Sequence, residues 1–412
     1  MSSRRDFLRA TALGAAAVSV APALLRGATE STRAIAPAGG PDSNGAVTIP
    51  RGAIIDWHTH WIGPRVTRLL EQRTTGPRYV INARGERFQV PHGSTEPPAN
   101  AKPQTSVWYD VKERLAHLDQ VGVERQLVGF VGSSYDGTLP PEEARPLWRA
   151  HNEDVAELVR TYPKRFLGLA TLPTADVAAA AAELERAHRE LGLIGATLPL
   201  DAFIHLESAR ALAPILAVAQ KYRSHLYIHR GAAAPTIPHQ TPEVGETNSY
   251  FGLPASRQPN GETQSVPGDH AWARSTLITS THLAAGAITL ALTDLLDPYP
   301  DITVQLTMIG GSIAHLIEAV EQRTERDGLP SPLPKLRRIY LDTGATGRGP
   351  RGIALAAKVF GADRILFGSD YGPWPTIEPF VQGVAKADLT PEERQLIYVE
   401  NGRALLRSKG LT

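Results

Sequence analysis

The amino-acid sequence predicts an α/β fold of the (β/α)8 TIM-barrel class, and three observations lead to this prediction. Short apolar segments alternate with helical segments eight times after residue 50, as parallel βαβ units require. The chain has 412 residues, a length that single barrels with loop insertions reach. No G-x-G-x-x-G pattern follows the first strand, which argues against the rival doubly wound open sheet.

The first 28 residues predict a targeting segment that precedes the barrel. Arg4-Arg5 and the apolar run over 10–25 resemble the twin-arginine export signal. Because that run is short and rich in Ala, we expect no stable membrane span after processing. Residues 29–50, rich in Ala, Pro, Gly and Ser, predict a linker, and 51–412 the barrel. The expected location is therefore periplasmic or extracellular.

The predicted strands are short, apolar and bounded by Gly, Pro or polar clusters. In chain order they cover 53–60, 126–131, 166–172, 196–200, 225–229, 302–308, 339–344 and 364–370. Helices are predicted from apolar periodicity and from Gly or Pro at their ends, over 110–121, 140–162, 176–191, 207–222, 275–296, 312–326, 351–360, 376–387 and 391–408. Two segments without a clear period, 74–106 and 231–272, predict excursions over the barrel mouth.

Charge and cysteine content exclude several classes of function. The net charge is +1, so no basic field points to nucleic acid or to an anionic membrane. The chain has no cysteine, which excludes disulfides, thiolate catalysis and Cys-ligated zinc. Any metal ion must therefore bind to His, Asp, Glu and water.

Four residues at predicted strand ends indicate a metal site. Alternation along the first strand predicts Asp56, His58 and His60 on one face, with the two histidines about 7 Å apart. His229 ends the fifth strand and Asp370 the eighth. Each alone is more often a packed histidine or a helix cap, but the carboxyl ends of barrel strands carry the active site. The set suits Zn²⁺, and also Mn²⁺, Fe²⁺ or Co²⁺.

Several motifs resemble the amidohydrolase superfamily, in the amidohydrolase-related branch that includes aminocarboxymuconate-semialdehyde decarboxylase. The similar stretches are 55–60, 226–229, 309–311, 340–343, 366–371 and 400–403, within about 53–408. The resemblance implies the barrel and one divalent ion, usually zinc, with His58, His60, His229 and Asp370 as ligands. The fourth strand lacks the lysine of binuclear relatives, so a single ion is expected.

One position departs from the pattern of this family. The family usually has a histidine two residues before the Gly-Gly that ends the sixth strand, and here that position is Met308. Methionine has no proton to transfer. Candidate replacements in acid–base chemistry are Asp342, His315 and Asp370, although Asp342 is equally compatible with a turn and His315 with a solvent-facing helix.

The expected partner is a small carboxylic acid. Trp57, Trp61, Tyr371 and Trp374 are candidates to stack on a planar substrate, and Arg230 to bind its carboxylate; packing and surface roles are the alternatives.

Three functions remain open at this point. The first is a metal-dependent lyase that decarboxylates an aromatic or unsaturated acid without oxidation. The second is a hydrolase that uses metal-activated water, with Asp370 as ligand and base. The third is an exported barrel that binds a ligand without turnover. The sequence leaves the assembly open, a homodimer included.

Overall fold

The computed structural model describes residues 53–91, 94–99, 101–129, 139–234, 236–237, 247–248, 253–254 and 271–411. The predicted export signal and linker, and most of the excursion 231–272, lie outside these residues. No helix in the part described has the length and apolar character needed to cross a membrane.

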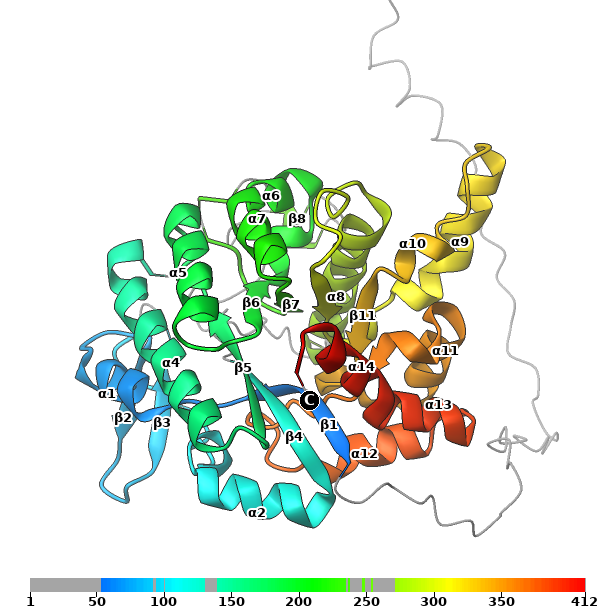
Figure 1. Ribbon diagram of the computed structural model, residues 1–412. Coiled ribbons are helices and arrows are strands. Elements are labelled where there is room, and N and C mark those ends of the chain that lie inside the picture. Colours follow the sequence, from blue (N-terminus) through cyan, green and yellow to red (C-terminus); the bar gives the residue numbers. More distant parts are fainter. Residues whose placement is uncertain are drawn as a thin grey trace, which may run out of the picture. The chain divides into compact units, whose positions relative to one another are not determined.

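The predicted barrel is confirmed. Eight strands form one parallel sheet in the order β1-β4-β5-β6-β7-β10-β11-β12 (Figure 1). Their bounds are β1 (Ile54–His60), β4 (Val123–Gly129), β5 (Phe166–Thr171), β6 (Gly195–Pro199), β7 (His225–His229), β10 (Thr303–Leu306), β11 (Ile339–Asp342) and β12 (Ile365–Leu366). The chain after β12 returns to β1, since Trp57 N donates to Phe367 O at 2.8 Å and Asp370 N to His58 O at 2.7 Å.

Helices surround this sheet. The α-helices are α1 (Pro64–Gln72), α2 (Val111–Val121), α4 (Pro141–Thr161), α5 (Val177–Arg189), α6 (Leu206–Arg210), α7 (Ala213–Lys221), α8 (Ala271–Ala287), α9 (Ile313–Arg326), α10 (Leu333–Leu336), α11 (Pro350–Phe360), α12 (Glu378–Ala385), α13 (Pro391–Gln395) and α14 (Asn401–Ser408). Short 3-10 turns follow several strands, among them η2 (Leu200–Phe203), η4 (Met308–Gly310) and η5 (Ala345–Arg348). Apolar residues on the inner faces of the helices pack on the sheet, which explains the periodicity in the sequence.

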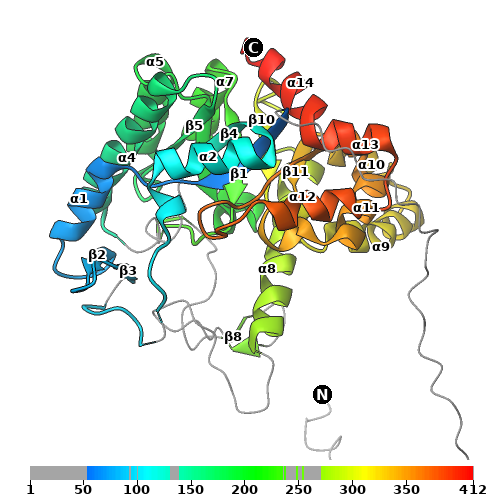
Figure 2. The same ribbon diagram turned by 90° about the horizontal axis from the view of Figure 1, so that it is seen from below.

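Two apolar clusters separate the outside of the barrel from its inside. The larger joins the outer strand faces, such as Ala196, Leu198 and Leu226, to the helices. The smaller fills the interior with Ile55, Trp57, Leu127, Leu167, Leu169, Tyr227 and Leu366, together with Leu405 and Leu406. The last two belong to α14, which therefore closes the amino-terminal end of the barrel. In Figure 2, α14 lies on the opposite side from the free end of α8.

A bulge in β1 corrects the predicted alternation. Asp56 is in register with Gln126 but Thr59 with Val128, so β1 uses one residue more than β4 over this stretch. Consequently Trp57 packs in the interior cluster while the next side chain, His58, contacts His60 and His229. Asp56 does not share their face: its carboxylate accepts hydrogen bonds from Gln126 and Ser369.

The sixth barrel strand is shorter than predicted. β10 ends at Leu306, and Met308 and Ile309 follow in the left-handed region with φ of 55° and 49°. Val304 and Leu306 face the outer cluster, whereas Gln305 and Thr307 contact interior groups. The polar parity of this strand therefore lines the interior, contrary to the facing that would place Val304 and Leu306 there.

The segment 74–106 contains regular structure that the sequence pattern did not reveal. β2 (Arg78–Ile81) and β3 (Arg87–Val90) form an antiparallel hairpin. Tyr79 and Val90 are buried, and Tyr79 packs in a separate cluster with Val66 and Leu70 of α1. Strands of four residues show too few alternations for a period to emerge from sequence.

Candidate metal centre

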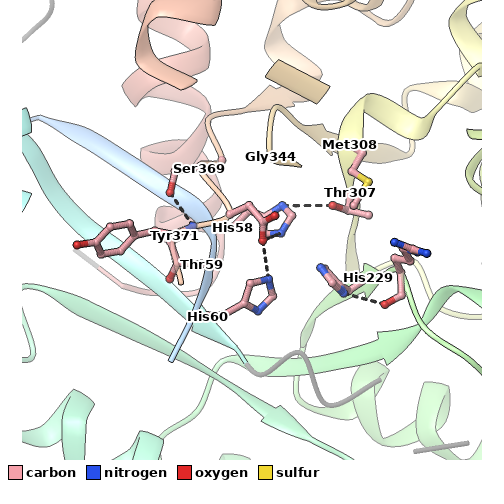
Figure 3. Close-up of polar contacts among 12 residues, drawn as sticks. His58, Thr59, His60, His229, Thr307, Met308, Gly344, Ser369 and Tyr371 are labelled. Atoms are coloured by element: carbon pink, nitrogen blue, oxygen red, sulfur yellow. Dashed lines mark hydrogen bonds and ion pairs between the residues drawn. The ribbon is translucent and has the colours of Figure 1, made fainter. Parts of the chain in front are cut away.

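Four side chains from three strand ends converge inside the barrel mouth. One donor atom from each of His58, His60, His229 and Asp370 lies within 4.8 Å of the others, and all four residues are buried. Nε2 of His58 lies 3.2 Å and Nε2 of His60 lies 3.0 Å from the same oxygen of Asp370. Figure 3 shows the three imidazole rings gathered from β1 and β7.

The outer nitrogens of two histidines are fixed by other groups, so that Nε2 is left for a ligand. His58 Nδ1 lies 2.9 Å from Asp342 Oδ1 and 3.2 Å from the Thr307 hydroxyl. His229 Nδ1 lies 2.9 Å from the Arg230 carbonyl and donates to it. Contacts of this kind set the tautomer and orientation of metal-binding histidines.

Asp342 is itself held in place by two donors. Gln305 Nε2 donates to one oxygen at 2.7 Å, and Gly344 N donates to the other at 2.8 Å. A Cβ on Gly344 would lie 2.0 Å from His58 Nδ1, so a larger residue at this position would displace the ring. The network thus fixes His58 relative to β10 and β11.

Backbone conformation turns Asp370 towards the histidines. Asp370 has a φ of 55°, which is uncommon outside glycine and is stabilised here by its backbone bond to His58 O. Gly372 follows with a φ of 125°, and a Cβ there would lie 2.8 Å from His60 O. The turn after β12 is therefore shaped around the histidine strand.

The electrostatics favour a cation at the centre of this cluster. Burial disfavours the charged form of His58, but the carboxylates of Asp342 and Asp370 raise its pKa to about 10. Burial lowers the pKa of His60 and lowers that of His229 well below its usual value. Burial opposes ionisation of Asp370, yet His58 and His60 lower its pKa overall. An ionised carboxylate beside buried imidazoles is the donor set that a divalent ion requires.

Ring nitrogens in the cluster have no hydrogen-bond partner among the described residues. These are His58 Nε2 and both nitrogens of His60. Buried polar atoms without a partner are rare in folded proteins, because each costs about 1–3 kcal/mol. The residues therefore fit a bound divalent ion.

Two buried hydroxyls on the interior wall were missed by sequence reasoning. Oγ1 of Thr171 and of Thr197 have no hydrogen-bond partner in the part of the chain described. The two residues are in register on β5 and β6, and Thr197 alternates with the outward-facing Ala196 and Leu198. These hydroxyls mark positions where a water or a ligand oxygen would be stabilised. A polar residue within an apolar strand was the available signal.

Three of the predicted aromatic contacts are not at the mouth. Trp57 is 1% exposed and packs in the interior cluster towards α14, and Trp61 lies buried in the outer cluster. The ring of Tyr371 points away from the histidines in Figure 3, and its hydroxyl lies 2.8 Å from His117 Nδ1. These positions correct the expectation that Trp57, Trp61 and Tyr371 contact a substrate.

Arg230 and Trp374 remain candidates to contact a ligand. Arg230 is exposed directly after His229. Trp374 is half-buried, and the Arg348 guanidinium lies 4.2 Å from its ring centroid. Arg348 was missed, because its contact with Trp374 joins η5 to the segment after β12 and has no local sequence signal.

The predicted acid–base residues also require correction. Asp342 is fully buried with both oxygens hydrogen-bonded, so it positions His58 and offers no free oxygen to a substrate. His315 lies on α9 with an exposed side chain. Met308 is 8% exposed and its sulfur accepts a hydrogen bond from the Thr346 hydroxyl at 3.5 Å.

Comparison with known proteins gives a consistent result. Residues 55–408 match the model of the amidohydrolase family. The chain is 25% identical over 309 residues to the gamma-resorcylate decarboxylase of Polaromonas sp. (strain JS666 / ATCC BAA-500), covering 72% of this chain and 88% of that protein.

Solved structures share the fold. The 5-carboxyvanillate decarboxylase of Sphingomonas paucimobilis matches with a TM-score of 0.60 at 20% identity, covering 88% of this chain and 100% of that one. A dihydroxybenzoic acid decarboxylase of Polaromonas sp. JS666, solved with bound manganese and the inhibitor 2-nitroresorcinol, matches with a TM-score of 0.59 at 20% identity and covers 86% and 97%.

Proposed function

The chain belongs to the amidohydrolase family, and from this premise we propose that it is a metal-dependent lyase that decarboxylates an aromatic carboxylic acid without oxidation. The observation that carries the proposal is the convergence of His58, His60, His229 and Asp370 inside the barrel mouth. Similarity to a gamma-resorcylate decarboxylase over 72% of the chain supports the reaction and a hydroxylated aromatic acid as substrate.

We propose that these four residues hold one divalent ion. Three imidazole nitrogens and one carboxylate oxygen suit zinc, the metal expected from the sequence, whereas a similar structure was solved with manganese. A bound ion would supply positive charge to hold the oxygen atoms of the acid. Elemental analysis of the purified protein distinguishes the two metals.

The chain's own residues then bind and orient the acid. Thr171 and Thr197 offer hydroxyls to oxygen substituents on the interior wall. Arg230 offers a guanidinium beside ligand His229, and Trp374 a partly buried aromatic face. Overall, the bond between ring and carboxyl carbon breaks, CO2 leaves, and the ring carbon takes up a proton.

Product analysis tests the reaction. The metal-loaded protein is incubated with 2,6-dihydroxybenzoate and 5-carboxyvanillate, and in parallel with their methyl esters and amides. We expect CO2 and the corresponding phenol from an acid. Hydrolysis of an ester or amide without CO2 would instead support the hydrolase, and binding without any turnover would support a ligand-binding barrel. His229→Ala serves as the control for dependence on the cluster.

We also propose that the protein is exported by the twin-arginine route to the periplasm or the cell exterior. Arg4-Arg5 and the apolar run over 10–25 support this proposal. Comparing the mature N-terminus with the encoded one locates the cleavage. Sedimentation of the mature protein tests whether it forms a homodimer.

A further inference from the structure

The proposed reaction needs a proton donor that the residues discussed so far do not supply. Loss of CO2 leaves an electron pair on a ring carbon, which must be protonated. Met308 carries no proton, Asp342 is committed to His58, and His315 is exposed on α9. The donor must therefore be another titratable group at the barrel mouth.

Asp201 and His282 form a carboxylate–imidazole pair there. Asp201 lies in η2, directly after β6, and is 4% exposed. Its Oδ1 lies 3.6 Å from Nδ1 of His282 on α8. Its Oδ2 is buried and has no hydrogen-bond partner among the described residues. A buried carboxylate oxygen without a partner carries a large desolvation cost, which a ligand or water proton would offset.

The backbone places this pair beside the metal ligands. Pro199 is in register with His229, and Asp201 N donates to Gly231 O at 3.1 Å. Asp201 thus lies next to the chain two residues beyond His229. Strand ends β6 and β7 bring the carboxylate to the same face of the barrel as the candidate metal centre.

The helix that carries His282 reaches from this point to Met308. Ser280 O accepts a hydrogen bond from Ser312 N at 3.2 Å, and a Cβ on Gly311 would lie 2.3 Å from the same oxygen. On the other side, a Cβ on Gly286 would lie 2.7 Å from Leu200 of η2. The turns of α8 around His282 therefore lie between η2 and the segment that follows Met308. Figure 2 shows α8 extending from the barrel at this end.

We propose that His282 is the proton donor of the decarboxylation and that Asp201 is its positioning residue. This inference rests on the proposed function. Contact between Asp201 and Nδ1 leaves Nε2 to deliver the proton, and the carboxylate stabilises the imidazolium before transfer. The Nε2–H bond breaks as the ring C–H bond forms, and water restores the proton after the phenol leaves.

The test compares two histidine variants that undergo the same chemical change. His282→Gln keeps a side chain of similar size but removes the transferable proton, and His315→Gln does so on the exposed face of α9. For His282→Gln we expect kcat to fall by about 10²–10⁴-fold, with KM and metal content little changed. For His315→Gln we expect wild-type kinetics.

Hydrogen exchange gives a readout that a structural role would not produce. In D2O the wild-type protein should catalyse exchange of the ring proton of the phenol product, observed by NMR, and His282→Gln should lose it. Asp201→Asn should lower kcat, and Asp201→Glu should restore part of it by returning a carboxylate.

Each outcome bears on a specific statement. Decarboxylation by the wild-type protein together with an unchanged kcat in His282→Gln would overturn the role of His282 and leave the proposed function intact. Loss of fold or metal in His282→Gln would make the pair structural and also overturn it. If no acid yields CO2 with the wild-type protein, the proposed function fails and this assignment with it.

Discussion

Replacing Asp342 with Asn probes the network that holds His58. The carboxylate accepts from Gln305 Nε2 at 2.7 Å and Gly344 N at 2.8 Å, and lies 2.9 Å from His58 Nδ1. An asparagine has one oxygen and an NH2 group that cannot accept. Whichever way the amide is turned, it leaves at least one buried donor without a partner.

The expected cost follows from these contacts. One buried unsatisfied donor should lower the unfolding free energy of the metal-free protein by about 1–3 kcal/mol. Losing the carboxylate behind a metal-binding histidine typically weakens metal affinity 10–100-fold, or about 1.4–2.7 kcal/mol. We therefore expect Asp342→Asn to fold but to bind its ion that much more weakly.

Competition with a fluorescent chelator measures the affinity, and urea unfolding of metal-free protein measures stability. Asp363→Asn is the matched control, because Asp363 pairs with Arg337 on the surface at 2.6 Å. Wild-type metal affinity in Asp342→Asn, combined with a turnover loss of about 10²–10⁴-fold, would refute the positioning role and return Asp342 to acid–base chemistry.

Three further variants test separate parts of the account. Met308→His should keep fold and metal content, since Met308 lies outside the ligand set; circular dichroism and elemental analysis check this, and loss of the ion would contradict it. Burial lowers the pKa of His151 from 6.5 to about 3, so its neutral form stabilises the fold above pH 6.5 and this stabilisation is lost as pH falls. His151→Gln should therefore flatten the fall in unfolding free energy between pH 6.5 and 5 by about 1.4 kcal/mol per unit, and parallel curves would contradict the assignment. Arg4→Lys with Arg5→Lys should retain the protein in the cytoplasm, and normal export in cell fractions would exclude the twin-arginine route.

Strand ends made the fold and the convergence of four residues predictable. In a parallel barrel every strand presents its carboxyl end at one face, so His60, His229 and Asp370 had to meet there once their strands were recognised. Hydrophobic segments and their Gly or Pro boundaries are local, and the sequence contains them in full.

The register of neighbouring strands could not be predicted in the same way. The bulge that turns Trp57 into the interior depends on pairing between β1 and β4, which are more than 60 residues apart in the chain. Similarly, Asp342 looked available for catalysis because its partner Gln305 comes from another strand. Contacts between distant segments decide whether a polar side chain binds substrate or positions another residue.

The polar face of the sixth strand was a signal that hydrophobic patterning alone misreads. Gln305 and Thr307 alternate with Val304 and Leu306, and barrels normally fill their interior with apolar residues. Beneath a metal site the interior carries the groups that fix the histidines, so the polar parity faces inward.

Dependence of decarboxylation on the metal tests the central claim most directly. The protein is stripped with a chelator, supplied with one equivalent of Mn²⁺ or Zn²⁺, and assayed for CO2 from a carboxyl-labelled hydroxybenzoate. We predict no CO2 from the stripped protein, recovery on adding one equivalent, and no recovery in His229→Ala. Equal release of labelled CO2 by the metal-free and the metal-loaded protein would contradict the account.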